Sequence, residues 1–228
     1  MRSYFYQKRK TVTVVFFSLL LFLCSTLLCA CHKKVDYFSY VSELRNNIFL
    51  AETEVFSLRI YSVQKESPYI ADGIPQESSA RTEIYLLAPT ENEPYSLFVT
   101  VNGKEQGGEL SYDNVKSEYY LFFSLDVSEL QSLSCRLEYA TESVSLEAQS
   151  VLCGEEISPK TLLQTLYNEN TELFSSMTDK YGFTGEIYFR LIYEGAPYYY
   201  VGIIDRNGEI HAFLVNAKTG KTLARRNS

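Results

Sequence analysis

The chain contains no tryptophan and only two histidines among its 228 residues. His32 lies close to the N-terminal apolar segment, and His211 alternates with Phe213 and Val215 in a predicted strand. A Ser-His-Asp or Cys-His catalytic set needs a histidine beside its nucleophile, and zinc sites commonly use several histidines or cysteines. The sequence therefore predicts no catalytic residues, no metal and no cofactor.

Basic residues are also few once the N-terminus is set aside. The first 30 residues hold four of the 21 lysines and arginines and none of the 28 acidic residues. The rest of the chain has 17 basic against 28 acidic residues, a net charge of −11. Nucleic-acid binding requires a basic surface, so we expect no nucleic-acid partner.

The N-terminus has the parts of a secretory signal. Arg2 and the basic residues 8–10 precede an uncharged stretch, residues 11–30, that ends in Leu28-Cys29-Ala30-Cys31. This box resembles the lipobox of bacterial lipoproteins, in which an aliphatic and a small residue precede a cysteine. The resemblance implies removal of residues 1–30, fatty acylation of Cys31 and attachment to the extracytoplasmic face of the cell membrane.

Two other interpretations of the N-terminus stay open. The apolar stretch, about 20 residues long, is also long enough to span a bilayer as an uncleaved anchor. Plain secretion is the third interpretation. Each of the three places the body of the protein outside the cytoplasm, where disulfides can form.

Cys135 and Cys153 are the cysteines left after Cys31. A bond between them would close a loop of about 17 residues and contribute about 3 kcal/mol. In a hairpin of residues 133–139 and 144–151, however, Cys135 faces about residue 148, and Cys153 lies out of reach of a bridge. Two free thiols are therefore favoured over the disulfide.

We expect residues 31–47 to form a short tether, and strand-like segments follow from about residue 48 to residue 153. Phe56, Leu58 and Ile60 alternate with polar neighbours, and Asn102-Gly103 is a favoured hairpin turn. Residues 117–127 are apolar on both faces, which indicates a central strand. Several such strands without a helix predict an immunoglobulin-like β-sandwich over residues 48–153.

A second part begins at residue 154. Ser158-Pro159 predicts a helix start, and apolar residues at helical spacing continue the helix to Met177, as a core-facing stripe. Three strands with clear turns and a short closing strand follow over residues 185–224. The predicted fold class is therefore mainly β with an α+β C-terminal part, in which one helix packs on an antiparallel meander.

The helix, the Tyr-Val hairpin and the closing Asn216-Ala217-Lys218-Thr219-Gly220-Lys221 turn resemble a PepSY-type domain over residues 154–228. That family occurs in secreted and membrane-attached bacterial proteins and modulates proteases or other partners without catalysis. The resemblance implies an interaction role.

The first hypothesis for function is a noncatalytic, membrane-anchored binding module for an envelope protein or glycan. Its expected contact surfaces are the sandwich loops and the sheet face around Tyr198 and Tyr200. Two alternatives stay open: an envelope enzyme that acts on glycans or peptidoglycan through carboxylates, and a structural envelope component. Residues 205–209 alternate oxygen ligands as in a calcium loop, but a tight hairpin explains Asn207-Gly208 better.

Overall fold

The computed structural model describes residues 35–68, 70, 72–90 and 93–227. The lipobox residues Leu28, Cys29, Ala30 and Cys31 lie outside the described residues. One compact unit begins at Asp36 and runs to the C-terminus. Within the described ranges, none of the helices is long and apolar enough to cross a membrane.

The unit consists mostly of strands. The elements in chain order are η1 (Tyr37–Tyr40), β1 (Val41–Glu52), β2 (Ser57–Glu66), β3 (Ser78–Leu87), β4 (Tyr95–Val101), β5 (Lys104–Glu109), β6 (Ser111–Asp113), β7 (Glu118–Phe123), β8 (Ser132–Tyr139), β9 (Glu142–Ser150), α2 (Pro159–Glu169), α3 (Thr171–Ser176), β10 (Thr178–Asp179), β11 (Gly182–Phe183), β12 (Glu186–Tyr193), β13 (Pro197–Ile204), β14 (Ile210–Asn216) and β15 (Thr222–Asn227).

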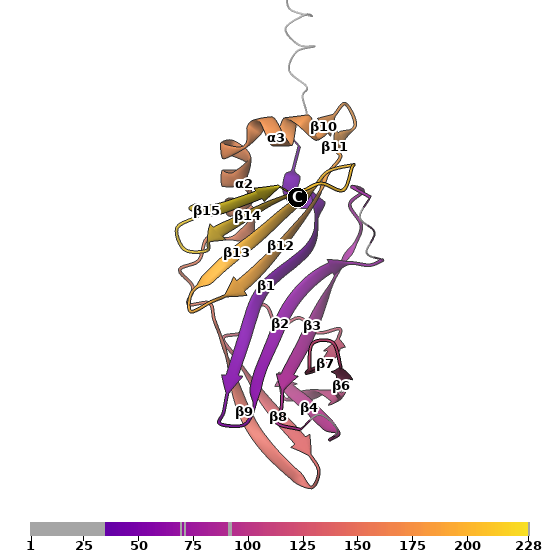
Figure 1. Cartoon of the computed structure of the whole chain (residues 1–228), viewed down its shortest axis with the longest axis vertical. Helices are drawn as coiled ribbons and strands as arrows, with labels where there is room; N and C mark the ends of the chain where they lie inside the picture. The colour runs from indigo at the N-terminus through magenta and orange to yellow at the C-terminus, as the bar shows by residue number, and fades with distance from the viewer. Residues whose placement is uncertain (1–34, 69, 71, 91–92, 228) are drawn as a thin grey trace, which may run out of the picture. The chain divides into compact units, whose positions relative to one another are not determined.

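Strand β1 joins the two halves of the chain into one sheet (Figure 1). Among the described residues, 13 strands form one sheet. Nine of them follow one another in the order β15-β14-β13-β12-β1-β2-β3-β7-β6, and β9, β8, β4 and β5 continue in that order from the last part of β1. The first part of β1 pairs with β12, in parallel, and its last part pairs with β9. All other described strand pairs are antiparallel.

One core lies inside the part of the sheet formed by β1–β9. These strands curl into a nearly closed, barrel-like sheet in which β5 approaches β7. The inward side chains come from alternate positions, as a period of two requires. They include Phe49, Leu58, Ile60, Ile84, Leu86, Tyr95, Leu97, Leu133 and Leu137, all at most 1% exposed.

A second core lies between the helices and β12–β14 (Figure 1). Ser158 caps α2 by accepting a hydrogen bond from the Thr161 N–H, and Pro159 occupies the first turn. Apolar side chains fill the space on both sides. Those from the helices are Leu162, Leu163, Leu166 and Phe174, and those from the sheet are Ile187, Phe189, Leu191, Tyr199, Val201, Ile203, Phe213 and Val215.

The predicted two-part fold, an immunoglobulin-like sandwich over residues 48–153 and a separate α+β part over residues 154–228, is wrong. The structure instead has one sheet that crosses the predicted boundary, because residues 41–45 of β1 pair with residues 187–190 of β12. A parallel partner about 145 residues away leaves no mark in the local pattern of either strand. Residues 41–47, predicted as tether, are the start of β1.

Two single elements also differ from the predictions. The predicted helix is broken at Asn170, which ends α2 and starts α3 with a non-helical backbone (φ −133°, ψ 39°). The predicted central strand over residues 117–127 is the shorter β7, second from the sheet edge, and its Phe122 is 53% exposed. Its apolar outer face is therefore a surface feature.

Candidate functional site

One outer face of the sheet carries arginine, lysine and aromatic side chains across β13, β12, β1, β2, β3 and β7. Arg59 pairs with Tyr85, and Tyr85 pairs in turn with Tyr120, at positions that alternate with the core residues. We call this surface the cation–aromatic face. Its basic members on the strands are Arg45, Arg59, Lys65, Arg81 and Arg190, and its aromatic members are Tyr61, Tyr85, Tyr120, Phe122, Tyr188 and Tyr200. Lys116, in the turn before β7, adds a sixth cation, 5.5 Å from the ring centre of Tyr85.

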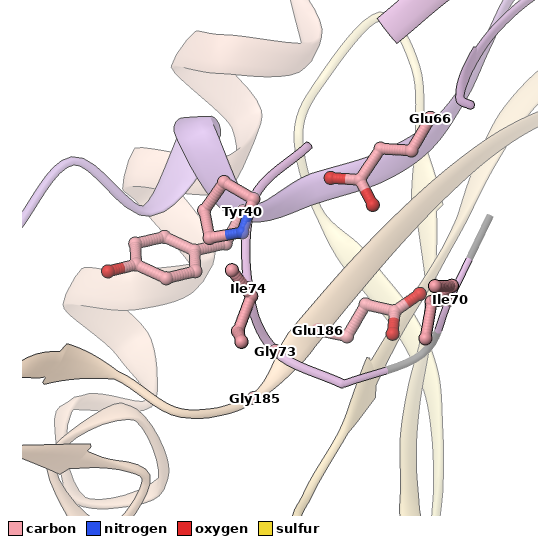
Figure 2. A pocket seen from close by; sticks show the side chains of 8 residues that line it. Tyr40, Glu66, Ile70, Gly73, Ile74, Gly185 and Glu186 are labelled. Carbon is pink, nitrogen blue, oxygen red and sulfur yellow. The ribbon is translucent and has the colours of Figure 1, made fainter. Parts of the chain in front are cut away.

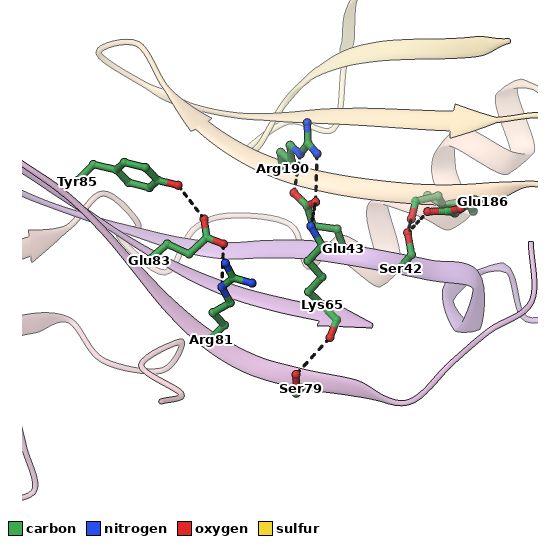
Figure 3. Close-up of polar contacts among 10 residues, drawn as sticks. Ser42, Glu43, Lys65, Ser79, Arg81, Glu83, Tyr85, Glu186 and Arg190 are labelled. Carbon is green, nitrogen blue, oxygen red and sulfur yellow. Dashed lines mark hydrogen bonds and ion pairs between the residues drawn. The ribbon is translucent and has the colours of Figure 1, made fainter. Parts of the chain in front are cut away.

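The parallel junction of β1 and β12 is held by an ion pair on this face (Figure 3). Arg190 donates to both carboxylate oxygens of Glu43, from Nε at 2.6 Å and from Nη2 at 3.1 Å, and Lys65 Nζ lies 3.5 Å from the same carboxylate. Burial raises the pKa of Glu43, but the hydrogen bond and charge of Arg190, helped by Lys65 and Arg45, outweigh burial and hold the pKa below its ordinary value.

A second polar group lies on β3 (Figure 3). Tyr85 donates a hydrogen bond of 3.2 Å to Glu83, whose other oxygen lies 3.2 Å from Arg81 Nε. Burial, together with the charge and hydrogen bond of Glu83, raises the pKa of Tyr85 to about 12. On β2, Arg59 donates to Glu118 at 2.7 Å.

The carboxylates of these pairs lie beneath the cations. The side chains of Glu43 and Glu118 are each 9% exposed and that of Glu83 is 17% exposed. Those of Arg59, Arg81 and Arg190 are 36–40% exposed. The face therefore presents positive charge to solvent, although residues 36–228 carry 15 basic against 28 acidic residues.

Aromatic rings hold several of the cations in place. The guanidinium of Arg45 lies 4.0 Å from the ring centre of Tyr61, that of Arg81 4.2 Å from Phe122, and that of Arg190 4.7 Å from Tyr188. Such contacts contribute about 0.5–1 kcal/mol each at exposed positions. The rings already restrict the motion of the guanidinium groups. A partner that binds these groups therefore causes a smaller loss of side-chain entropy.

A glycine makes room for one of these rings. Tyr188 stacks with Tyr200 at a centroid distance of 5.9 Å and lies over Gly202 on β13. A Cβ atom at Gly202 would lie 2.0 Å from Cζ of Tyr188. Only glycine permits this ring position.

The predicted binding residues Tyr198 and Tyr200 are half-buried on β13 and alternate with the buried Tyr199. They therefore lie on the side of β13 that carries the cation–aromatic face. The arginines of the face were not predicted as binding residues. A signal was present, since Arg or an aromatic residue recurs at every second position in Arg59-Ile60-Tyr61 and Tyr188-Phe189-Arg190, but nothing showed that these segments share one face.

A small cavity lies where β1 and β12 begin (Figure 2). Glu66 at the end of β2 and Glu186 at the start of β12 line it, together with Tyr40, Ile70, Gly73, Ile74, Pro75 and Gly185. The space open to the centre of a water molecule is about 10 Å³, about that of a single water. A sugar ring does not fit.

The two predicted disulfide cysteines are not bonded to each other. Cys135 is buried and Cys153 is exposed, and both thiols are free, so the disulfide alternative is not supported. Burial raises the pKa of the Cys135 thiol to about 12.

Residues 205–209 form a hairpin turn, as their Asn207-Gly208 pair predicts. Asp205 Oδ1 accepts hydrogen bonds from the backbone N–H groups of Asn207 and Glu209, both at 2.8 Å. These bonds, the one from Glu209 first, hold the pKa of Asp205 below its ordinary value. His211 lies near both acids, and its Nδ1 is 3.2 Å from Asn227 Oδ1. The carboxylate of Asp205 is thus engaged in the turn.

Comparisons of this chain with protein-family models, with curated protein sequences and with solved structures gave no match.

Proposed function

We propose that this protein is a lipid-anchored, noncatalytic binding protein of the extracytoplasmic membrane surface, whose cation–aromatic face takes an anionic partner. The observation that carries the proposal is the layering of exposed arginines over buried carboxylates in an otherwise acidic unit. Such a face attracts negative charge while the rest of the surface repels it.

The residue types of the face support binding. Arginine and aromatic residues are enriched at interface centres, because they combine a large contact area with directed hydrogen bonds. The resemblance of residues 154–228 to PepSY-type domains, which remains a prediction, agrees with an interaction role. The cavity beside Glu66 and Glu186 is too small for a glycan.

The lipobox supports the proposed location. If Cys31 carries two acyl chains, at about 0.8 kcal/mol per buried methylene, the attachment is lasting. Four residues separate Cys31 from Asp36, where the compact unit begins, and the five Cα–Cα steps between them span about 17 Å when extended. The binding unit then stays at the membrane surface.

The anchor is tested by labelling cells with radioactive palmitate and fractionating them. Wild type should be labelled and found in the membrane fraction, and Cys31→Ser should be unlabelled and either unprocessed or released. Absence of label from both proteins would show that the lipid anchor does not exist.

The binding face is tested by photocrosslinking in intact cells, with a benzophenone amino acid at Phe122. We expect a crosslinked partner whose yield falls at least about tenfold in Arg81→Glu. Reversing the charge of a side chain that contacts an anionic partner should reduce the binding free energy by about 1.4 kcal/mol or more. Arg136→Glu is the matched control, since Arg136 packs on Phe98 at 4.6 Å but lies on β8, outside the face. Equal yields from Arg81→Glu and Arg136→Glu would reject this face as the binding site.

A further inference from the structure

Two arginines of the cation–aromatic face, Arg45 and Arg81, use few of their hydrogen-bond donors. A guanidinium carries five N–H groups. Within the described ranges, Arg45 forms no ion pair, and its one hydrogen bond runs from Nη1 to the carbonyl oxygen of Leu191 at 3.4 Å. Arg81 Nε lies 3.2 Å from Glu83 outside hydrogen-bond geometry, and Arg81 donates no hydrogen bond to a described residue. Both cations therefore have N–H groups from which an anion can accept.

The two arginines lie on opposite sides of one strand. Val63 of β2 is the register partner of both Arg45 on β1 and Arg81 on β3. Their Cα atoms are therefore two inter-strand spacings, or about 9.5 Å, apart. The guanidinium groups lie over the rings of Tyr61 on β2 and Phe122 on β7, which are also two strands apart. At this spacing one tetrahedral anion can accept hydrogen bonds of about 2.8 Å from both groups.

The charge around these two arginines is positive. Four cations of this part of the face are set against two carboxylates: the cations are Arg45, Lys65, Arg81 and Arg190, and the carboxylates are Glu43 and Glu83. Figure 3 shows both carboxylates drawn into contacts with cations of this group. The remaining charge of +2 suits a phosphate group, whose oxygen atoms match the planar fork of a guanidinium.

The membrane itself is a source of phosphate within reach of this site. Arg45 is the fifth residue of β1, and only η1 separates β1 from Asp36, where the compact unit begins. Rises of about 3.3 Å per strand residue and about 2.0 Å per residue of η1 keep Arg45 within about 26 Å of Asp36. The proposed anchor and its short tether therefore hold these arginines close to the lipid headgroups.

We propose that Arg45 and Arg81 bind the phosphate group of an anionic phospholipid of the membrane to which the chain is anchored. The inference rests on the proposed function, since it names the anionic partner of the cation–aromatic face. An acidic protein segment would offer carboxylates to the same arginines. The exposed ring of Phe122 beside Arg81 favours the lipid, because an aromatic ring next to a cation suits the boundary between headgroups and acyl chains.

The test uses the full chain with a benzophenone amino acid at Phe122, reconstituted into phosphatidylcholine vesicles with and without phosphatidylglycerol. After illumination, mass spectrometry measures the adduct of protein and lipid. We expect more adduct with phosphatidylglycerol, and about fivefold less in Arg45→Gln and in Arg81→Gln. This is the equivalent of about 1 kcal/mol for each cation near an anionic surface. Salt at about 1 M, which screens charges beyond about 3 Å, should remove the gain.

Arg136→Gln is the matched control, since Arg136 also packs on a phenylalanine but lies on β8. Equal adduct in the two kinds of vesicle, or in all three variants and wild type, overturns the inference. Loss of the adduct to soluble glycerol phosphate, at the concentration of the lipid phosphate, assigns the site to a free phosphate and also overturns it. If Arg45→Gln does not fold, Arg81→Gln and the salt dependence decide the question.

Failure of this inference is distinguishable from failure of the proposed function. A protein crosslinked in cells in an Arg81-dependent way, without a lipid adduct in vesicles, overturns the lipid as partner and leaves the binding face in place. Crosslinking that does not depend on Arg81 in cells or in vesicles removes both.

Discussion

The guanidinium of Arg190 binds the carboxylate of Glu43, a residue 147 positions earlier in the chain, through two hydrogen bonds. This pair lies at the parallel contact between β1 and β12 that joins the N-terminal and C-terminal strands into one sheet. It also forms the middle of the cation–aromatic face. One interaction thus serves both the continuity of the fold and the charge of the proposed binding surface.

Replacement of Arg190 should destabilise the protein in a pH-dependent way. Arg190→Ala leaves the buried Glu43 with weaker compensation, and at pH 7 we expect a loss of about 1–2 kcal/mol in the free energy of unfolding, measured with urea. Because the pKa of Glu43 in the folded protein lies below its ordinary value of 4.5, the stabilisation is present above pH 4.5 and is lost as the pH falls further, through the folded pKa.

The control for this prediction is Arg136→Ala. The partners of Arg136 are Glu105 and Glu138, whose side chains are 47% and 44% exposed, so we expect a clearly smaller effect. An Arg190→Ala variant with the same loss of stability at pH 7 and at pH 3 would contradict the role assigned to the pair.

A methyl group at Gly202 should displace the ring of Tyr188. The Cβ atom of Gly202→Ala would lie 2.0 Å from Cζ of Tyr188, and the strain should cost about 1–3 kcal/mol in urea unfolding. Gly108→Ala in β5 is the control, since no heavy atom lies within 4 Å of its Cβ position. Equal stabilities of the two variants would mean that Tyr188 does not lie over Gly202.

The two cysteines of the folded unit should differ in reactivity. Cys153 is exposed, whereas Cys135 is buried with its pKa raised to about 12, and only the thiolate reacts. Iodoacetamide followed by peptide mass spectrometry should therefore label Cys153 in the native protein and Cys135 only in denaturant. Protection of both cysteines until a reductant is added would instead reveal a disulfide.

Separation of the chain at residue 153 should abolish folding of the pieces. A fragment of residues 36–153 keeps β2 beside the first half of β1 but loses β12 from its other edge, and a fragment of residues 154–228 exposes the edge of β12 that pairs with β1. We expect neither fragment alone to show the dispersed NMR spectrum of a folded protein. A well-dispersed spectrum from either fragment would mean that folding does not require the pairing of β1 with β12.

Local features of the fold could be predicted because they depend on residues close in sequence. The Ser158 cap and Pro159 start α2 as expected, and turns at residues 205–209 and 216–220 end their strands as expected. The apolar stripe of the helices is core. Capping and turn geometry are set within four or five residues, so the sequence carries them directly.

The missed parts of the candidate site depend on strand order. Tyr120 and Phe122 were interpreted as one side of a buried strand, but in β7 they face outward beside Tyr85 and Arg81. Their apolar character alone cannot tell an interior from a binding surface. The arginines of β1, β2, β3 and β12 form one surface only because these strands are neighbours in the sheet.

By itself the sequence determined the acidic composition, the lipobox-like N-terminus, the turns and most strands of this protein. Only the tertiary structure decided that β1 unites the two halves, that six cations share one face above buried carboxylates, and that Glu66 and Glu186 meet at one cavity. The physical reason is that strand pairing joins backbone groups, which are alike in every residue. Which distant segments become neighbours is therefore settled by the packing of the whole chain.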